Sequence, residues 1–586
     1  MNNTLKKIDD TNRTFAQTLN YFIEQYILPD ITEDNTLVID YHEIEGVFSN
    51  EGLTEKFESK KLEILRKISE KVEKRIILQE MPITHDLKDV LSSNIGEIVC
   101  FEGVIKSKSE LRPEPNKITY ECQKCQHTFK CFVQLIDLTD RPPHPNFCQN
   151  CGGKDFLEVK RETEYIDVVN MKIEEPFENR IGGDVRNFTC LIKGTLADPN
   201  RNFYPGDKVQ ITGILNEIEI ERARTKKRMF VIDVLNLVGL QTNYKTLEIT
   251  PEDIKQIQEL ADQPDIFKKL KDSILPDLIG HDEIKEGILC QAFSVEKDEN
   301  SKRDEIHILL AGDPGSNKSQ ILKRIESLNL KAGHTVGGGT TEAGLLGATI
   351  RDEITGSWNT EPGLMPMCND GLIAFDEIDK TNPTLLGKLN EAMEQQTVTI
   401  TKAGRSITYP CRTLVLGALN PKNGHFNNYK SVREQIQLPD SVLDRFDLIY
   451  ILQDIPNEKK DSEIVRLLGG FRSNKDNIIP DEQLQKYISY SKREIDPEPS
   501  PEAVQLFTDY YNRIRFDNDN VKFIGPRDAE ALYRIAKSIA RIELKNVVDE
   551  NHANKAIKIL DDSLRTFYLM PRESSVEPLE MNVFDN

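Results

Sequence analysis

The sequence predicts a multidomain protein in which a helical N-terminal region and a small β-barrel precede an α/β domain that is followed by further helices. The chain has 586 residues, which at about 150 residues per domain allows three or four domains. Near residue 98 the hydrophobic pattern changes from helical to strand-like, and near residue 253 it changes again, to buried runs that alternate with helices. These two changes of period set the order of the domains.

Composition and charge restrict the classes of function. Lys and Arg number 76 against 97 Asp and Glu, a net charge of −21, so any nucleic-acid binding has to come from local basic features. The chain has no run of 18 apolar residues, and its N-terminus, MNNTLKKIDD, lacks the apolar centre of a signal peptide. Ten cysteines are too few for a disulfide scaffold and fit a reducing compartment. We therefore expect a cytoplasmic protein without a membrane span.

The first two domains follow from periodicity. Residues 1–96 repeat apolar side chains at helical spacing, for example Phe22, Ile23, Tyr26 and Ile27. Residues 97–243 contain short β-branched and aromatic runs that Gly, Pro and Asn interrupt, and their even spacing favours an OB-fold barrel. A polar linker over 244–252 ends in the helix-start signal Thr250-Pro251.

The second half reads as an α/β domain with a helical end. Between 253 and 470 the buried runs IHILLAG, GLIAFDE and TLVLGALNP alternate with helical segments, which is typical of a parallel sheet in a doubly wound domain. Residues 471–570 are predicted to be helical, and the acidic stretch 571–586 is expected to fray.

Four cysteines form two paired knuckles, Cys122-x2-Cys125 and Cys148-x2-Cys151. Two knuckles of this spacing complete a tetrahedral four-thiolate zinc shell, which is a closed and therefore structural site. We expect it to stabilise an insert in the barrel at about residues 118–158. His127 and Cys131 are alternative ligands that we interpret as bystanders. Core packing is the better interpretation of the other five cysteines, which are Cys100, Cys190, Cys290, Cys368 and Cys411.

A phosphate-binding loop follows the first buried run of the α/β domain. It comprises Gly312, Asp313, Pro314, Gly315, Ser316, Asn317, Lys318 and Ser319, and a helix follows it. In this context backbone N–H groups and the helix N-terminus face the phosphates of ATP, Lys318 reaches the β and γ oxygens, and Ser319 ligates magnesium. The usual glycine before the lysine is Asn317 here.

Polar residues at the ends of later strands complete the predicted site. Asp376 and Glu377 end the run LIAFDE, where Asp376 would hold magnesium and Glu377 would orient the attacking water; a helix cap is the alternative. Asn420 ends TLVLGALNP and could bond the γ-phosphate or the water, although Asn before Pro is commonly a turn residue. Arg445 and Arg527 are candidates for the transition-state charge, but each alone is by default a solvated side chain.

As a set, these motifs resemble one family, the minichromosome maintenance (MCM) replicative DNA helicases of the AAA+ class, in an archaeal-type form. GDPGSNKS, AFDEIDK, EAMEQQTVTITKAG, ALNP, LDRFD and PRDAEAL occur in the family's order, and the resemblance covers about residues 5–570. It implies a homo-hexameric ring, or a double hexamer, with an N-terminal collar, an AAA+ ATPase core and a helical lid. Replication-initiation or loading factors, and an association with the nucleoid, are also implied.

The resemblance further implies that active sites form between subunits. Lys318, Ser319, Asp376, Glu377 and Asn420 would come from one subunit. Arg445 as the finger and Arg527 as the sensor would come from its neighbour, with Arg303 as a further candidate.

The resemblance also implies contacts to single-stranded and forked DNA on two basic hairpins and one further arginine. Lys402 lies at the tip predicted between the arms of Thr397 to Thr408, where it would grip phosphate; a plain surface hairpin is the alternative. In the collar, basic residues cluster between NEIEIE and RMFVIDV, and a solvated loop is the alternative there: Arg222, Arg224, Lys226, Lys227 and Arg228. Arg186 matches the family's collar position for single-stranded DNA. Ala348 to Glu361, with Trp358, resembles the family's insert in the second helix of the motor.

The sequence departs from the family in three places. Asn317 replaces a small residue, Gly337-Gly338-Gly339 replaces Gly-Lys-Gly, and the chain stops where a winged-helix domain would begin. We predict an ATP-dependent replicative helicase that moves along single-stranded DNA, with ATP, Mg²⁺ and Zn²⁺ as cofactors. Two alternatives stay open: an AAA+ loader or remodeller that acts on protein, and a non-catalytic ring that binds DNA and nucleotide.

Overall fold

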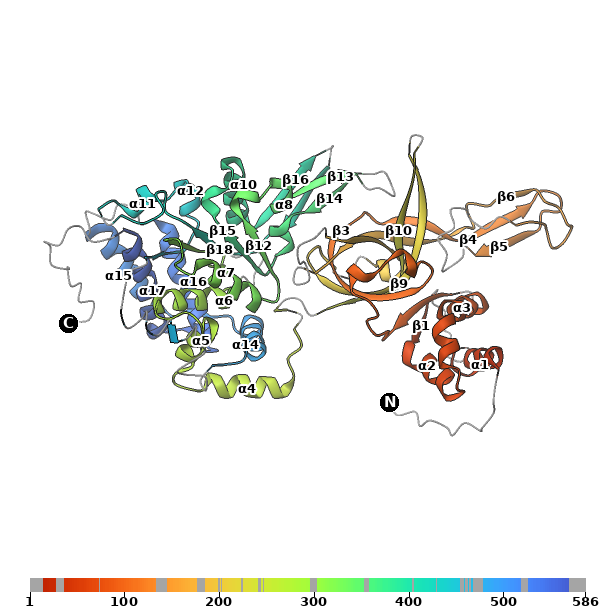
Figure 1. The fold of residues 1–586 in the computed structure, drawn as a ribbon, viewed down its shortest axis with the longest axis horizontal. Coiled ribbons are helices and arrows are strands. Elements are labelled where there is room, and N and C mark those ends of the chain that lie inside the picture. The colour runs from red at the N-terminus through yellow and green to blue at the C-terminus, as the bar shows by residue number, and fades with distance from the viewer. Residues whose placement is uncertain are drawn as a thin grey trace. The chain divides into compact units, whose positions relative to one another are not determined.

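The structure is a computed structural model that folds into two compact units, residues 1–240 with 351–359 and residues 241–350 with 360–586 (Figure 1). It describes residues 14–27, 36–72, 74–132, 145–176, 185–198, 201, 203–222, 225–240, 244–245, 247–295, 303–351, 358–402, 405–427, 429–453, 458, 462, 465–466, 478–517 and 525–568. The predicted acidic end, 571–586, lies outside these residues.

The N-terminal part of the first unit contains helices, as predicted, and also two strands that were not predicted. The elements are α1 (Phe15–Phe22), the π-helical turn η1 (Ile23–Ile27), β1 (Thr36–Asp40), α2 (Tyr41–Asn50), α3 (Thr54–Val72) and β2 (Arg75–Gln79). β1 and β2 pair in parallel from Thr36↔Arg75 to Asp40↔Gln79. Their short apolar runs, TLVID and RIILQ, are too brief for periodicity to separate strand from helix.

A closed β-barrel follows. Its strands are β3 (Ile98–Lys108), β7 (Glu164–Glu174), β8 (Asn187–Lys193), β9 (Lys208–Arg222) and β10 (Thr225–Gly239). The order is β3-β9-β10-β8-β7, and β3 pairs with β7 as well as β9, which closes the barrel. The strands β4 (Arg112–Cys122), β5 (Thr128–Phe132) and β6 (Phe156–Glu158) extend away from it, and β9 and β10 continue beyond it as a long hairpin (Figure 1).

A buried ion network joins the helical part of this unit to the barrel. Asp233 of β10 is 1% exposed and receives the Arg75 guanidinium at 3.0 Å and the Lys193 ammonium at 3.1 Å. Arg75 Nη2 also donates to the Val234 carbonyl at 3.3 Å. Because Arg75 lies on β2, the network fixes that strand against the barrel wall.

The second unit is built on a five-stranded sheet with the order β12-β15-β18-β11-β19. The strands are β11 (Ile308–Gly312), β12 (Ala332–Val336), β15 (Leu372–Asp376), β18 (Leu414–Leu419) and β19 (Leu448–Leu452), and all their pairings are parallel. β11, β15 and β18 are almost entirely buried, which accounts for their continuous apolar runs, whereas β12 and β19 are partly exposed. β11 lies between β18 and the edge strand β19, so the loop after it sits beside the carboxyl end of β18.

Helices and short hairpins surround this sheet (Figure 1). The helices are α4 (Pro251–Ala261), α5 (Ile266–Ile274), α6 (Asp282–Phe293), α7 (Lys318–Leu328), α8 (Glu342–Leu345), α9 (Leu364–Met367), α10 (Pro383–Gln395), α11 (Val432–Gln435) and α12 (Asp440–Leu443). The hairpins are β13 (Gly347–Arg351) with β14 (Trp358–Pro362), and β16 (Thr397–Lys402) with β17 (Arg405–Pro410). Thr250 caps α4 as predicted, since the Asp253 N–H donates to its hydroxyl at 3.2 Å.

The C-terminal helices form the lid. They are α14 (Asp481–Glu494), α15 (Pro501–Asp517), α16 (Pro526–Ile542) and α17 (Glu550–Tyr568), with the short strands β20 (Glu498–Pro499) and β21 (Val547–Val548) between them. α17 packs against β19, and α16 packs against α6 and α17. The five cysteines assigned to core packing are buried, as predicted: Cys100, Cys190, Cys290, Cys368 and Cys411.

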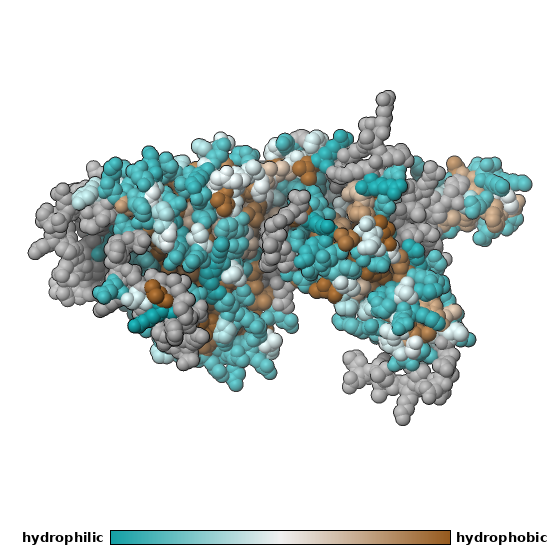
Figure 2. Space-filling view, viewed as in Figure 1, coloured by the Kyte–Doolittle hydropathy of each residue, from teal (hydrophilic) through white to brown (hydrophobic). Residues whose placement is uncertain are grey.

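On the face that Figure 2 shows, most side chains of the second unit are hydrophilic, in keeping with a chain whose charged residues make up 30%. Among the residues that the structure describes, no helix is both long enough and apolar enough to cross a membrane. The domain boundaries drawn from the sequence stay predictions.

Candidate active site, zinc site and DNA contacts

The loop between β11 and α7 has the backbone of a phosphate-binding loop. Gly315 has φ +85° and Asn317 has φ +60°, so both lie in the left-handed region. Asn317 is the N-cap of α7, directly before Lys318. Glycine tolerates this region best and asparagine tolerates it better than most other residues. This conformation explains how the loop closes although Asn317 replaces the usual glycine.

Lys318 is held inside the loop. Its side chain is buried, and its ammonium donates to the carbonyls of Gly312 at 2.8 Å and Asp313 at 2.7 Å and to the Ser316 hydroxyl at 3.1 Å. Burial lowers the pKa of Lys318, and the nearby carboxylates of Asp376 and Asp313 partly oppose that shift. The Lys318 ammonium and the backbone N–H groups at the N-terminus of α7 are both positively polarised hydrogen-bond donors. Together they suit the negatively charged oxygens of a phosphate group.

Ser319 and Asp376 lie together, as predicted. The Ser319 hydroxyl donates to Asp376 Oδ2 at 2.7 Å, although the two residues are 57 positions apart. Asp376 ends β15, and the other carboxylate oxygen accepts the Glu377 N–H at 2.9 Å. A hydroxyl and a carboxylate are hard oxygen ligands of the kind that Mg²⁺ takes beside nucleotide phosphates, so this pair fits the ion.

Glu377 has a constrained backbone and a partner that the sequence analysis missed. Its φ is +50°, and a Cβ on Gly337 would lie 2.1 Å from its carbonyl oxygen, so residue 337 has to be glycine. The Lys380 ammonium lies 2.5 Å from Glu377 Oε1. The i,i+3 spacing in AFDEIDK was the available signal for this pair.

Asn420 follows β18, at the same edge of the sheet as the carboxylates. Its backbone N–H bonds the Asp379 carboxylate, whose pKa is raised by burial despite that bond. Asn420 is half-buried. The structure therefore places Lys318, Ser319, Asp376, Glu377 and Asn420 along one sheet edge, which is where a ligand of an open α/β sheet binds.

The two candidate arginines lie elsewhere. Arg445 donates through Nε to Asn390 Oδ1 at 2.7 Å and through Nη2 to Glu394, and Arg527 Nη2 lies 3.7 Å from the same Glu394. Arg445 precedes the amino end of β19, whereas the phosphate loop follows the carboxyl end of the parallel neighbour β11. Five residues of strand span about 16 Å. Arg445 therefore lies at the opposite sheet edge from its own loop.

The Arg445 side chain is 11% exposed, and Arg303, the further candidate, is also engaged within its own chain. Its side chain is 14% exposed, and Nη2 donates to both oxygens of Asp447, at 2.9 and 3.1 Å. The partner is 144 residues further along the chain, so no local sequence pattern indicates this ion pair.

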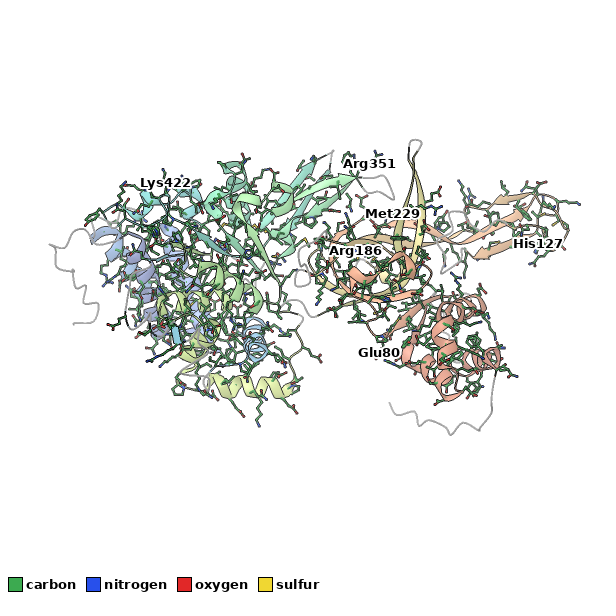
Figure 3. The ribbon with its side chains drawn as sticks, in the orientation of Figure 1. Glu80, His127, Arg186, Met229, Arg351 and Lys422 are labelled. Carbon is green, nitrogen blue, oxygen red and sulfur yellow. The ribbon has the colours of Figure 1, made fainter. Side chains whose placement is uncertain are left out.

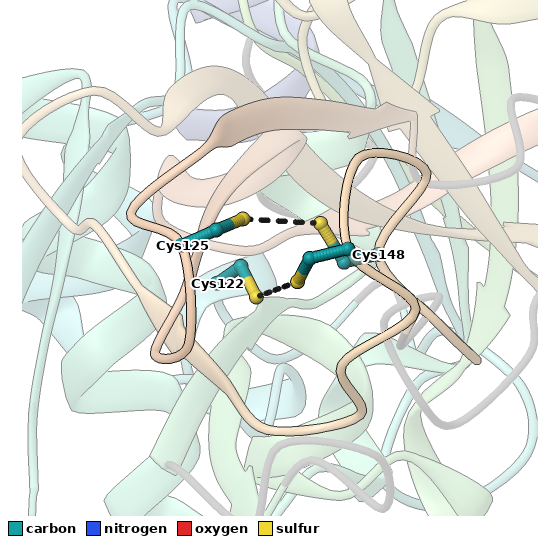
Figure 4. A group of neighbouring side chains, drawn as sticks. Cys122, Cys125 and Cys148 are labelled. Atoms are coloured by element: carbon teal, nitrogen blue, oxygen red, sulfur yellow. Dashed lines mark hydrogen bonds between the residues drawn. The ribbon is translucent and has the colours of Figure 1, made fainter.

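The four cysteines of the predicted zinc site converge (Figure 4). Their Sγ atoms all lie within 4.8 Å of one another, with Cys122 and Cys151 at 3.5 Å and Cys125 and Cys148 at 3.6 Å. Zinc–sulfur bonds of about 2.3 Å in a tetrahedron give a sulfur separation of about 3.8 Å, so the donor set fits Zn²⁺. Burial opposes the Cys122 thiolate, but N–H groups of Lys124 and Cys125 donate to it and its pKa falls to about 7.

His127 and Cys131 are outside that group. The His127 ring stacks on Phe129, with centroids 6.4 Å apart, near the outer end of the extension formed by β4, β5 and β6 (Figure 3). This agrees with their interpretation as bystanders.

The Lys402 hairpin has the predicted form. β16 and β17 pair antiparallel from Thr397↔Pro410 to Lys402↔Arg405, and Lys402 is exposed at the turn end. The Tyr409 hydroxyl donates to the Thr360 carbonyl at 3.0 Å, which links this hairpin to β14. Most of the insert predicted at Ala348–Glu361 is described as β13 and β14, and Trp358 is half-exposed; residues 352–357, like the hairpin tip 403–404, lie outside the described residues.

The collar arginines are only partly described. Arg228 is exposed on β10 and contacts Glu217 at 3.3 Å and Glu219 at 3.9 Å. Arg224 and the side chains of Arg222, Lys226 and Lys227 lie outside the described residues. Arg186 is exposed on the barrel, where Nη1 donates to the Val90 carbonyl at 3.4 Å (Figure 3). These contacts leave Arg186 and Arg228 accessible.

Comparisons with known proteins agree with this geometry. Family models match as an MCM OB domain over residues 86–219, an MCM P-loop domain over 253–469 and an MCM AAA-lid domain over 482–564. The minichromosome maintenance protein MCM of Saccharolobus solfataricus is 33% identical over 507 residues, which cover 84% of this chain and 73% of that protein. An uncharacterised MCM-type protein of Methanocaldococcus jannaschii is 31% identical over 85% of this chain and 72% of its own length.

A plant relative is more distant. The DNA replication licensing factor MCM4 of Arabidopsis thaliana is 30% identical over 81% of this chain, and the match spans 60% of that protein. The predicted fold class is confirmed: a helical N-terminal part and an OB barrel with a four-cysteine insert precede a P-loop ATPase core and an AAA lid. The chain belongs to the minichromosome maintenance family of replicative helicases.

Proposed function

We propose that the chain is an ATP-dependent DNA helicase that acts as a homo-hexameric ring, moves along single-stranded DNA and unwinds the duplex at a fork. The observation that carries this proposal is the division of charged groups between two edges of one sheet. Lys318, Ser319 and Asp376 occupy the carboxyl edge, and Arg445 occupies the amino edge. A subunit arranged in this way completes its site with the arginine of a neighbour.

Within that site each side chain has a distinct role. The Lys318 ammonium and the N-terminus of α7 hold the β- and γ-phosphates, and the Glu377 carboxylate orients the attacking water once Lys380 releases it. Asn420 donates to the γ-phosphate or the water. Ser319 and Asp376 would hold Mg²⁺, which supplies charge neutralisation at the phosphates when bound.

Arg445 and Arg527 of the neighbouring subunit would stabilise the charge that develops during hydrolysis. Both guanidiniums are close to Glu394, which occupies them in the isolated chain. A phosphate competes well for two guanidiniums because it accepts hydrogen bonds from both and carries more charge than one carboxylate. An arginine supplied in trans raises phosphoryl-transfer rates by about 10³–10⁵-fold in other P-loop ATPases.

The DNA contacts would lie on the two hairpins. Lys402 would grip phosphate in the channel, and the basic residues near the β9–β10 tip, Arg222, Arg224, Lys226, Lys227 and Arg228, with Arg186, would hold the strand in the collar. Such contacts let a chain of net charge −21 bind DNA without sequence preference. Double-hexamer formation, replication-initiation or loading partners, and a cytoplasmic location at the nucleoid belong to the same proposal, as does structural Zn²⁺ in the barrel extension.

The decisive experiment is ATP-dependent strand displacement on a forked DNA duplex, at low and at physiological salt. The purified protein is compared with Glu377→Gln, which keeps the size of the side chain and removes its charge. We expect unwinding by the parent and none by the variant, with DNA and nucleotide binding intact in both. DNA binding and ATP binding without turnover in the parent would instead favour the non-catalytic ring, and ATP turnover stimulated by protein but not by DNA would favour a loader or remodeller.

A further inference from the structure

Arg445 and Arg527 both lie close to Glu394 although they come from different parts of the second unit, and the Arg445 side chain is 11% exposed. Arg445 follows α12 of the ATPase core, and Arg527 is the second residue of α16 in the lid. Both contact Glu394 near the end of α10. Their relative position therefore depends on what fixes the lid helix α16 against the turn after α12.

One buried carboxylate makes that connection. Asp447 follows the turn, and its side chain is 3% exposed. Arg534, on α16, donates to Asp447 Oδ1 from Nε at 3.1 Å and from Nη2 at 2.7 Å. Arg303 adds two further hydrogen bonds, and the His307 N–H donates to Oδ2 at 2.8 Å. Four N–H groups thus make five hydrogen bonds to the carboxylate.

The same guanidiniums reach the backbone that carries the catalytic candidates. Arg303 Nη1 donates to the Arg445 carbonyl at 3.4 Å, and Arg534 Nη1 donates to the Arg303 carbonyl at 3.2 Å. Burial alone would raise the pKa of Asp447, but the two guanidiniums outweigh it and the pKa lies below its ordinary value. The carboxyl is therefore charged, and removing that charge would leave two buried cations without their counter-ion.

Because Arg534 and Arg527 lie on the same helix, α16, the network around Asp447 also affects the position of Arg527. Arg527 and Arg534 are seven residues apart, which is about two helical turns, so they lie on the same side of the helix. Arg534 is 4% exposed and anchored by Asp447, whereas Arg527, in the first turn of α16, is half-exposed. A shift at Arg534 would be carried to Arg527 by the rigid helix.

We propose that Asp447 is a positioning residue for ATP hydrolysis, which holds Arg303 and Arg534 and thereby presents Arg445 and Arg527 as one rigid pair to the nucleotide of the neighbouring subunit. This inference rests on the proposed function, since it gives those two arginines their role. The competing explanation is that the network only stabilises the fold. A buried ion network commonly adds no more stability than well-packed apolar side chains of similar size, so we infer that this network instead fixes one arrangement of α16 against the turn after α12.

The first test measures position without turnover. Asp447→Asn keeps the shape of the side chain and removes its charge. In the full-length protein we expect backbone amide hydrogen exchange to rise by about tenfold or more in segments 440–446 and 525–530, and to stay unchanged in α4. Lys537→Gln is the matched control, because Lys537 lies on the same helix but bonds Asp304 at 3.1 Å; it should leave segment 525–530 as in the parent. Unchanged exchange in Asp447→Asn would overturn the proposal.

If Asp447→Asn does not fold, Arg534→Lys serves the same purpose. Lysine keeps the positive charge beside Asp447 but cannot make the two-pronged contact of the guanidinium. The same two segments should exchange faster, and equal exchange in this variant and the parent would overturn the proposal.

The second test is a double-mutant cycle on hydrolysis. We expect Asp447→Asn to lower kcat by about tenfold or more with KM within about twofold, and Asp447→Asn/Arg527→Ala to lose no more activity than Arg527→Ala alone. Full additivity would show that Asp447 does not act through Arg527. If the parent itself has no turnover, the proposed function fails, and the exchange experiment still decides whether Asp447 positions the two elements.

Discussion

At the residue scale, Asn317 replaces the usual glycine of the phosphate-binding loop without changing the backbone conformation that the loop requires. The site depends on a left-handed backbone directly before Lys318, and Asn317 adopts it at φ +60°. We predict that Asn317→Gly keeps nucleotide affinity within about threefold, whereas Asn317→Val weakens it by about tenfold, because a β-branched residue resists this conformation by about 1–2 kcal/mol. Titration with a fluorescent ADP analogue checks both. Equal affinity in the two variants would show that the backbone at residue 317 is not what matters.

Also at this scale, the motif residues were predictable and their partners were not. Lys318, Ser319 and Asp376 were found because a strand, a loop and a helix have fixed local signatures, and parallel strands bring their carboxyl ends to one edge. The pair of Arg445 with Glu394 and the pair of Arg534 with Asp447 span 51 and 87 residues. Each side chain reads in sequence as an ordinary solvated charge, and only tertiary folding brings the partners together.

At the element scale, the extension formed by β4, β5 and β6 depends on four thiols. We predict about one zinc per chain, lost in Cys148→Ser, with nucleotide affinity unchanged because the extension belongs to the other unit. Thiol-reactive release of zinc, followed by a colorimetric chelator, measures the stoichiometry. His127→Ala is the control and should retain the metal. Loss of zinc in His127→Ala, or its retention in Cys148→Ser, would contradict the assignment.

The zinc site also implies a direction of pH dependence. Zinc binding requires thiolates, and within the Cys122–Cys151 pair the pKa of Cys122 is lowered to about 7 while the pKa of Cys151 is raised to about 12. Protons therefore compete with the metal increasingly as the pH falls through and below the lower value, so zinc affinity should decrease from about pH 8 to about pH 6. Competition titration with a chelator of known affinity at each pH measures this trend, and a constant affinity would contradict it.

The Lys402 hairpin carries a second prediction at the element scale. If Lys402 contacts a DNA phosphate, Lys402→Ala should weaken binding to all single-stranded sequences equally. It should also reduce the dependence of log affinity on log salt by about 0.7 for each phosphate that the variant no longer neutralises. Fluorescence anisotropy at several salt concentrations measures the slope. Lys255→Ala, which removes another exposed lysine, on α4, should leave the slope unchanged.

Some elements could not be predicted. β1 and β2 are five-residue apolar strands inside a helical region, and their parallel pairing joins positions 36 and 75, so no local pattern marks it. The hairpin β9–β10 was predicted as two strands with a basic tip because β-branched and apolar runs flank the cluster of basic residues on both sides.

At the scale of the whole molecule, Arg75 determines how the N-terminal helices attach to the barrel. Arg75→Met would leave Asp233 with Lys193 as its remaining cation, and we expect a loss of about 3–5 kcal/mol. Hydrogen exchange in β2 and in α3, which precedes it, measures this loss locally, which suits a protein of several domains. Lys67→Met, which removes a half-exposed partner of Glu63, should cost less than about 1 kcal/mol. Equal effects of the two substitutions would contradict a structural role for the buried network.

The placement of Lys318 and Arg445 at opposite ends of the sheet strands also determines how many complete active sites an assembly of a given number of subunits would contain. If Arg445 serves a neighbouring subunit as proposed, each subunit carries its phosphate loop on one surface and this arginine on another. A two-fold dimer then cannot complete both sites with one contact, and the subunits have to join head to tail. An open arc would always contain one site fewer than its subunits, with one unused arginine pair at one end and one incomplete phosphate loop at the other. Closure of the proposed ring would remove both ends at once, so the last subunit to join would add two working sites rather than one.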